Sequence, residues 1–248
     1  RASMEEYFAR TGMLLGDRAM ERLACSRVAV FGLGGVGGHC AEALARCGIG
    51  SFLLVDGDCV TPTNINRQAV AFVSTLGKKK VDVMAERMRD INPKVSVRAL
   101  AAFYGPQSDL GVWEDAPDLV VDAIDAVPAK IDIIVRAKAH GVPVVSCMGA
   151  GNKRDPMAFE AADLYETSVC PLCRVMRAQA RRHGIDALRV IYSREAPQVP
   201  QPCLRDGTGR PIPASVSFVT AAAGLALAAE AVRMLLEIGI KNEQTGNF

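Results

Sequence analysis

The first 150 residues of the chain alternate between short apolar runs and longer segments in which apolar residues recur every three or four positions. The apolar runs predict strands at residues 27–31, 51–55, 95–101, 119–122 and 143–147. The segments with helical spacing predict helices at residues 14–25, 36–47, 78–92 and 128–140. Because strands and helices alternate, we expect an α/β fold in which helices cover both faces of a mainly parallel sheet.

The last third of the chain has a different pattern and predicts a C-terminal extension. We expect a basic helix at 171–183, a strand at 188–193, a loop rich in proline and glycine at 196–213 and an alanine-rich helix at 215–238. We therefore assign residues 8–156 to a core and residues 157–240 to a C-terminal region that completes the same domain. The last helix is short and rich in alanine for a membrane span, so we interpret it as a packing or dimer helix and predict no membrane contact.

The composition is that of an ordinary soluble globular protein. Of the 248 residues, 50% are hydrophobic and 23% are charged, and the net charge is +2. A nucleic-acid partner would therefore need a local basic patch, because the overall charge is too small to attract one. The N-terminus lacks the apolar segment of a signal peptide, and the eight cysteines are interpreted as reduced thiols. We expect a cytoplasmic protein.

One basic stretch could form such a patch. Its arginines are Arg174, Arg177, Arg181, Arg182, Arg189 and Arg194. The first three of them fall on one face of the predicted helix. Two interpretations are open, a solvated helix face and a contact for the phosphate backbone of RNA.

A glycine-rich turn between the first predicted strand and the helix after it indicates a nucleotide site. Gly32, Gly34 and Gly37 fit the G-x-G-x-x-G pattern, with Gly35 between them, and Asp56 follows the last glycine by 19 residues. Glycines let the backbone approach a phosphate, and the helix N-terminus carries partial positive charge towards it. Asp56 is placed to accept hydrogen bonds from ribose hydroxyls. The turn predicts a Rossmann-like doubly wound sheet.

Polar and cationic residues after Asp56 favour a triphosphate over a nicotinamide. These residues are Asp58, Asn64, Arg67, Gln68 and Lys80. An arginine and a lysine near a glycine turn suit the concentrated charge of phosphate groups, whereas nicotinamide needs a flat apolar pocket. Asp125 follows another predicted strand, at the edge where open parallel sheets bind ligands, and could hold Mg²⁺ between phosphates.

Order and spacing of these residues resemble the E1-like (ThiF/MoeB/HesA-type) adenylating family. The matching elements are Gly32-x-Gly-Gly-Val-Gly37, Asp56-x-Asp58, Asn64-x-x-Arg67-Gln68, Lys80 and Asp125. The resemblance implies ATP and Mg²⁺ as cofactors, and Arg67, Lys80 and Asp125 as catalytic residues. Arg10 matches the N-terminal arginine that, in this family, reaches into the partner subunit's ATP site, so a homodimer is implied.

Within that family, the chain is most similar to the tRNA threonylcarbamoyladenosine dehydratases. Segments 8–16, 41–50, 83–93, 121–125 and 149–156 carry this similarity. It implies adenylation of the carboxylate of N6-threonylcarbamoyladenosine at position 37 of tRNA, followed by ring closure with loss of AMP. The core would then be the ATP-binding adenylation unit, and residues 157–240 would serve the substrate and the dimer.

Other functions stay open. The same site could adenylate the C-terminal glycine of a ubiquitin-like sulfur-carrier protein, and a complete zinc site would favour that function. Cys170 and Cys173 form half of such a zinc site, and Cys203 or His183 would have to complete it. An NAD-dependent oxidoreductase and a non-catalytic nucleotide-binding scaffold are further alternatives, against which Arg67, Lys80 and Asp125 argue.

Overall fold

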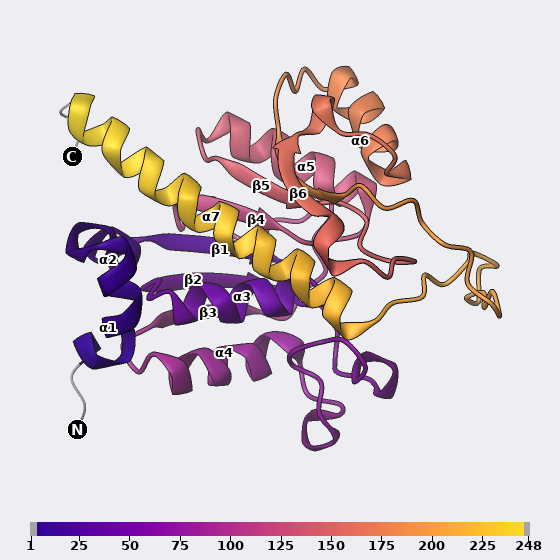
Figure 1. Ribbon diagram of the computed structural model, residues 1–248, viewed down its shortest axis with the longest axis horizontal. Helices are drawn as coiled ribbons and strands as arrows, with labels where there is room; N and C mark the ends of the chain where they lie inside the picture. Colours follow the sequence, from indigo (N-terminus) through magenta and orange to yellow (C-terminus); the bar gives the residue numbers. More distant parts are fainter. Residues whose placement is uncertain (1–3, 246–248) are drawn as a thin grey trace.

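A single seven-stranded sheet organises the chain (Figure 1). The computed structural model describes residues 4–245, and side chains from residue 6 to residue 237. The strands are β1 Arg27–Phe31, β2 Ser51–Val55, β3 Ser96–Leu100, β4 Leu119–Asp122, β5 Val144–Cys147, β6 Phe159–Asp163 and β7 Arg189–Ser193. The helices are α1 Met4–Leu15, α2 Asp17–Cys25, α3 Gly37–Arg46, α4 Lys80–Ile91, α5 Val127–Ala139, α6 Pro171–Arg182 and α7 Ser217–Thr245.

The strand order is β3-β2-β1-β4-β5-β7-β6, and every pair is parallel except β6 with β7. The chain runs outward from β1 to β3 on one side and then returns to β4 on the other. This reversal defines a doubly wound sheet and places a topological switch point between β1 and β4. The predicted α/β class and the mainly parallel sheet are confirmed. The proposed division near residue 156 stays a prediction.

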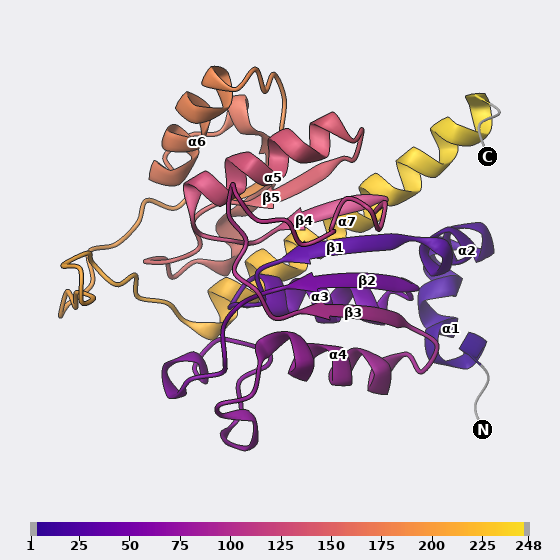
Figure 2. The same cartoon turned by 180° about the vertical axis from the view of Figure 1, so that it is seen from behind.

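Each face of the sheet has its own hydrophobic core, because successive side chains of β1 point to opposite faces. Val28 and Val30 pack with α3, α4 and α7 on one face, whereas Ala29 and Phe31 pack with α5 and α6 on the other. Figure 2 shows α5 on the side of the sheet opposite to α3 and α7. Burial of both faces explains why the strands appear in the sequence as continuous apolar runs.

Two local predictions were incomplete. The helix expected at 14–25 is interrupted at Gly16, whose φ of +87° ends α1 Met4–Leu15 before α2 begins. Strand β6 Phe159–Asp163 was not predicted. Its sequence, Phe-Glu-Ala-Ala-Asp, has weak strand propensity, and its side chains are only partly buried at the edge of the sheet. Pairing with β7 creates the strand.

The long helix α7 packs along α3 across one face of the sheet (Figure 1). Gly224 permits the close approach, because a Cβ atom there would lie 2.4 Å from the carbonyl oxygen of Val36. Among the described residues, one segment, Ser217–Glu237, is long and apolar enough to cross a membrane. Half of its most apolar window is buried inside the protein, as in a core helix.

Candidate nucleotide-binding site

A pocket of about 800 Å³ opens at the carboxyl ends of β1, β2, β4 and β5. It lies at the switch point of the sheet, where doubly wound folds bind ligands. The pocket is lined by most of the residues that the sequence singles out, namely Gly32, Gly34, Gly35, Asp56, Asp58, Asn64, Arg67, Lys80 and Asp125. Residues from three separate connections, β1 to α3, β2 to α4 and β4 to α5, therefore meet in one place.

The glycine turn follows β1 and leads directly into α3. Gly32 has a φ of +87°, and a Cβ atom on it would lie 2.7 Å from the carbonyl oxygen of Ala123. A Cβ atom on Gly37 would lie 1.9 Å from the carbonyl oxygen of Gly32. Packing therefore requires both glycines. At Gly34 the nearest atom to such a Cβ is 3.9 Å away, in Gln68, so this glycine leaves open space beside the N-terminus of α3.

Asp56 fixes this turn while it faces the pocket. One carboxylate oxygen accepts the Leu33 backbone N–H at 2.6 Å, and the other accepts the Asp58 N–H at 2.8 Å. The side chain thus links the end of β2 to the glycine turn. Each oxygen keeps a second lone pair, which can accept a hydrogen bond from a ligand hydroxyl.

Two cations line the phosphate end of the pocket. Lys80 begins α4 and is 4% exposed, and its ammonium lies 2.9 Å from a carboxylate oxygen of Asp58. Arg67 donates to the carbonyl oxygen of Thr63 at 2.8 Å and to Asn66 at 3.0 Å, and burial lowers the pKa of its guanidinium. Both cations are held by short polar contacts, so their charge is fixed in position before a ligand enters.

Two buried amides sit beside them. Asn64 is 8% exposed, and its side-chain oxygen accepts the Thr61 N–H at 3.0 Å, which shapes the loop that carries Arg67. Gln68 is 7% exposed, and its side-chain oxygen is buried without a hydrogen-bond partner among the described residues. An unpaired buried oxygen is unfavourable. Gln68 therefore offers an acceptor to a ligand that donates a hydrogen bond, a role that its place in the Asn64-x-x-Arg67-Gln68 motif did not predict.

Asp125 lies beyond the end of β4, is exposed and lines the pocket. It has no hydrogen bond or ion pair with the rest of the described chain. The structure also adds pocket residues that the sequence did not assign, notably Phe103, Thr220 and the turn 148–153. The ring of Phe103 is 75% exposed and covers Gly57, on which a Cβ atom would lie 2.6 Å from it. An exposed aromatic ring at the edge of a nucleotide pocket offers a surface on which a base can stack.

A buried ion pair holds together the ends of two strands, β4 and β5, at which the pocket opens. Lys130 and Asp122 are both fully buried, with the ammonium 2.9 Å from the carboxylate. The ammonium also donates to Ser146 at 3.2 Å and to the carbonyl oxygen of Cys147 at 2.8 Å. These contacts tie the end of β4, which leads to Asp125, to the end of β5, which leads to the turn 148–153. Every polar group of the cluster is paired, as burial requires.

The arrangement combines a glycine turn, a carboxylate at the end of β2 and two fixed cations, which suits a nucleotide with its phosphates against α3. A family model agrees with this geometry, because the ThiF family model matches residues 8–248. The chain belongs to the ThiF family. Among its relatives, the tRNA threonylcarbamoyladenosine dehydratase of Bacillus subtilis is 39% identical over 94% of this chain and 96% of that protein.

Solved structures of ThiF-family relatives share the whole fold. The Escherichia coli tRNA N6-threonylcarbamoyladenosine dehydratase, TcdA, in complex with ATP has a TM-score of 0.86 and 31% identity, with 96% of each chain covered. The same enzyme in complex with AMP has a TM-score of 0.87 and 32% identity, again with 96% of each chain covered. The resemblance inferred from the sequence is therefore confirmed at the level of family and fold.

Arg10 does not join the pocket of its own chain. It is exposed and lies on α1, which Figure 1 shows near the amino ends of the strands. The pocket lies at their carboxyl ends. A role for Arg10 in the ThiF-family site therefore needs a second copy of the chain.

The described residues do not form a zinc site, which Cys170 and Cys173 left open as an alternative. Cys170 and Cys173 lie together at the start of α6, but no group of three His, Cys, Asp or Glu side chains in the described part of the chain could hold a metal ion. His183 is exposed at the opposite end of α6, and Cys203 is exposed in the 196–213 loop. Structural zinc needs four ligands, so two cysteines alone cannot hold it.

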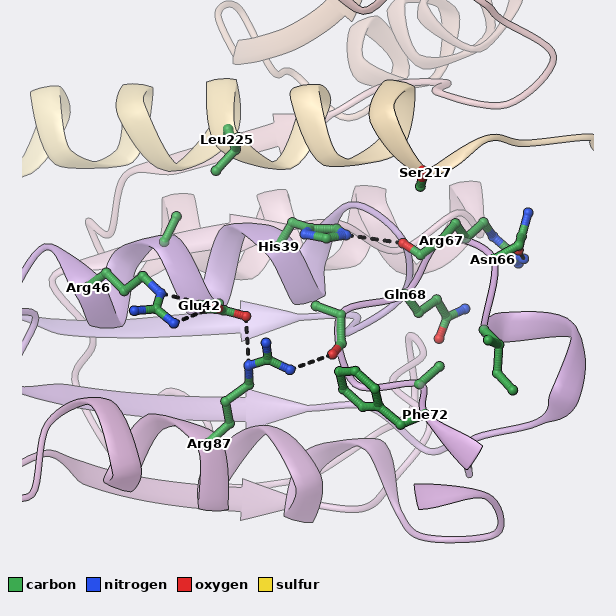
Figure 3. A pocket seen from close by; sticks show the side chains of 14 residues that line it. His39, Glu42, Arg46, Asn66, Arg67, Gln68, Phe72, Arg87, Ser217 and Leu225 are labelled. Atoms are coloured by element: carbon green, nitrogen blue, oxygen red, sulfur yellow. Dashed lines mark hydrogen bonds and ion pairs between the residues drawn. The ribbon is translucent and has the colours of Figure 1, made fainter. Parts of the chain in front are cut away.

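A second cavity of about 470 Å³ lies between α3, the 65–72 loop and the start of α7 (Figure 3). Its charged side chains already have partners within the protein. Glu42 binds Arg46 at 2.9 Å and Arg87 at 2.8 Å, and His39 contacts the carbonyl oxygen of Arg67 at 3.1 Å. Partly exposed Leu225 and Phe72 border it. The cavity adjoins the nucleotide site through Arg67, which lines both.

Proposed function

We propose that this protein is an ATP-dependent adenylating enzyme that cyclises N6-threonylcarbamoyladenosine at position 37 of tRNA. The observation that carries the proposal is the meeting of the glycine turn, Arg67, Lys80 and Asp125 in one pocket. The likeness to dehydratases over almost the entire chain, including structures in complex with ATP and AMP, supports the choice of nucleotide and substrate.

The chemistry requires little proton transfer from the protein. A carboxylate oxygen of the threonylcarbamoyl group attacks the α-phosphate of ATP, the bond to the β-phosphate breaks, and pyrophosphate leaves. Lys80, Arg67 and Arg10 of a partner subunit offset the negative charge that develops. The acyl-adenylate then reacts with the threonylcarbamoyl group itself and expels AMP, which carries away the former carboxylate oxygen. The net change in the nucleoside is the loss of one water.

Asp125 is the residue that we assign to Mg²⁺. Mg²⁺ is commonly held by one or two carboxylates together with substrate phosphates, so a free carboxylate at the phosphate end fits it. The ion would neutralise phosphate charge and orient the departing pyrophosphate.

The Asp125→Asn variant is expected to lower the rate of AMP formation by on the order of 100-fold at low Mg²⁺, and added Mg²⁺ should restore part of the loss. The fold should be unaffected, because the Asp125 side chain is exposed and makes no hydrogen bond or ion pair with the rest of the described chain. Asp109→Asn removes an exposed carboxylate outside the pocket and serves as the control. A normal rate and normal Mg²⁺ dependence of Asp125→Asn would exclude this assignment.

A homodimer is part of the proposal, because Arg10 can only serve the site of a second chain. The exposed apolar side chains on α1 and α7 support it, and they are Tyr7, Met13, Leu14, Phe218 and Leu225. Such side chains are typical of a surface that another chain covers.

Mixing inactive variants tests whether Arg10 acts across the interface. Arg10→Ala and Lys80→Ala homodimers should both be inactive, but a mixed dimer contains one site with both residues intact. After exchange of subunits, about a quarter of the wild-type activity should return, since half of the dimers are mixed and each has one working site. Recovery of no activity, despite verified subunit exchange, would show that Arg10 acts within its own chain or not at all.

The tRNA would approach from the mouth of the pocket, where the loop 196–213 carries exposed arginines. Among the arginines predicted to form a patch, Arg177 donates to Thr167, Arg181 stacks on the ring of Tyr165, and Arg189 pairs with Glu230. These three therefore have structural partners. The ends of the loop 196–213 line the pocket, and the loop projects from the rest of the protein (Figure 1). It carries exposed Arg205 and Arg210 on a short hairpin whose bridge joins residues 205 and 211.

The double variant Arg205→Gln/Arg210→Gln is expected to weaken tRNA binding and to reduce the salt dependence of log Kd by about one to two units of slope. ATP binding should not change, because neither side chain lines the pocket. The control Lys94→Gln/Lys138→Gln removes the same charge from exposed lysines that precede β3 and β5, at the amino ends of the strands and away from the pocket. Equal effects of the two double variants would mean that the loop makes no specific phosphate contact.

The function itself is tested by the release of AMP and pyrophosphate. Both products should require tRNA that carries threonylcarbamoyladenosine, and unmodified tRNA should not replace it. Release that depends on a ubiquitin-like protein would instead support activation of a protein C-terminus, and no release with either substrate would leave a binding scaffold. A change in nicotinamide absorbance would favour an oxidoreductase.

A further inference from the structure

Two cysteines of the pocket wall have no part in the chemistry above. Cys170 is the residue before the first turn of α6 and Cys173 lies in that turn, so their spacing is Cys-Pro-Leu-Cys. Cys170 is 3% exposed and Cys173 is fully buried. One turn of helix brings side chains at this spacing to the same face, which suits a bond between the two sulfurs.

The two thiols differ in their surroundings. The sulfur of Cys170 interacts with the thiol of Cys173 and accepts backbone N–H groups of Cys173, Leu172 and Gly149, and these donors lower the pKa of Cys170. Interaction with Cys170, together with burial, raises the pKa of Cys173. A thiolate at a helix N-terminus beside a protonated thiol is the arrangement of reactive Cys-x-x-Cys pairs.

Position makes Cys170 the reachable member of the pair. Cys170, Pro171 and Leu172 line the 800 Å³ nucleotide pocket, whereas Cys173 does not. A Cβ atom on Gly149 would lie 3.7 Å from the Cys170 sulfur, so the sulfur borders the turn that forms the pocket wall. The remaining cysteines lack this combination, because burial raises the pKa of Cys40, Cys47 and Cys147, and the pocket is not lined by Cys25, Cys59 or Cys203.

We propose that Cys170 and Cys173 are a redox modification site, at which a small hydroperoxide entering the empty nucleotide pocket drives formation of a reversible intramolecular disulfide. The Cys170 thiolate attacks one peroxide oxygen, the O–O bond breaks, and Cys170 becomes a sulfenic acid. The sulfur of Cys173 then attacks the sulfur of Cys170, and water leaves. Overall, two thiols are oxidised and one hydrogen peroxide is reduced to two waters. A dithiol reductant reverses the bond by thiol–disulfide exchange.

The disulfide changes the nucleotide site. In the reduced protein the Cys170 sulfur accepts the N–H of Gly149, and Gly149 lies in the turn that lines the pocket. A disulfide sulfur carries no negative charge and is a weak acceptor, so the turn loses this hydrogen bond. We therefore expect oxidation to weaken ATP binding several-fold and bound ATP to slow the oxidation. The effect on ATP rests on the proposed function, whereas the disulfide does not.

Peptide mass measures the modification directly. Trypsin releases residues 155–174 as one peptide, which contains Cys170 and Cys173 and no other cysteine. After treatment of the whole protein with hydrogen peroxide and alkylation, this peptide should be lighter by two hydrogens and carry no alkyl group. In the Cys173→Ser variant, Cys170 should instead be trapped by dimedone as a sulfenic acid. In the Cys170→Ser variant, Cys173 should remain an alkylatable thiol.

Exposed Cys203 supplies an internal reference, because its oxidation in the same sample shows that peroxide was sufficient. If Cys203 is oxidised while both cysteines of the 155–174 peptide remain thiols, the proposal is wrong. Oxidation of Cys170 to a sulfinic acid without a disulfide would also overturn it. Calorimetric titration with ATP before and after oxidation tests the second part, and equal affinities would remove the effect on the nucleotide site. These readouts need no turnover, so they fail or succeed independently of the proposed reaction.

Discussion

The Lys80→Ala variant is expected to lower kcat/KM for ATP-dependent AMP release by on the order of 100- to 1000-fold, the usual loss when a fixed group that stabilises charge is removed. Lys80 is buried, lines the pocket and is held 2.9 Å from Asp58, so its ammonium is in place before ATP binds. Water that enters in its place would have to reorient around the phosphates, and Asp58 would be left as an uncompensated negative charge.

Lys79→Ala is the matched control, because Lys79 is the neighbouring residue, has the same charge and is exposed outside the pocket. It should retain kcat/KM within about twofold, as expected for a surface substitution. A Lys80→Met variant keeps most of the buried aliphatic volume and separates loss of charge from loss of packing. If Lys80→Met folds normally and turns over ATP at the wild-type rate, the assigned role of Lys80 is wrong.

The Lys130→Met variant is expected to lower the free energy of unfolding by about 3–5 kcal/mol, because it leaves the buried carboxylate of Asp122 without its cation. For a protein of this size, such a loss corresponds to a fall in Tm of roughly 10 °C. Nucleotide binding should weaken as well, since the cluster joins the strand ends that lead to Asp125 and to the turn 148–153.

Two controls separate this effect from a general loss of charge. Lys138→Met changes an exposed lysine of the same helix, and Tm should move little. The double variant Lys130→Met/Asp122→Asn removes both charges and should recover part of the lost stability, because a neutral amide is less unfavourable in the core than an unpaired carboxylate. If Lys130→Met is as stable as the wild type, the buried pair does not support the pocket.

Much of the fold could be predicted because its core strands are buried on both faces. Continuous apolar runs gave β1, β2 and β4 with their observed ends, and helical spacing gave α3, α4 and α5 to within two residues. The glycine turn was predictable for a steric reason. Only glycine fits at residues 32 and 37, where a side chain would meet backbone atoms.

The rest depends on contacts between distant parts of the chain. Strand β6 forms only because β7 pairs with it, and its own sequence has no strand signal. The buried ion pair between Lys130 and Asp122 could not be predicted from the sequence, because a lysine on an amphipathic helix is usually exposed. Phe103, Thr220 and the turn 148–153 join the site through the fold rather than through any motif. The position of Arg10, away from its own pocket, likewise follows from the packing of α1.

The residues of the pocket suit a nucleotide and the activation of a carboxylate. They do not distinguish a carboxylate on a tRNA base from one at the C-terminus of a protein. The cations and Asp125 are placed to contact the phosphates of ATP, and these phosphates are the same whether a tRNA base or a protein C-terminus is adenylated. Similarity to dehydratases over 94% of the chain favours the tRNA base. We therefore propose that the exposed loop 196–213, whose ends line the pocket, contacts the RNA.

The central claim is tested most directly by mass analysis of nucleosides from tRNA incubated with the purified protein, ATP and Mg²⁺. We expect that threonylcarbamoyladenosine is converted to a nucleoside lighter by one water, in amounts equal to the AMP released, and that Lys80→Ala slows the formation of both products by the same large factor. Nucleosides of unchanged mass, with ATP consumed at the same rate whether or not tRNA is present, would contradict it.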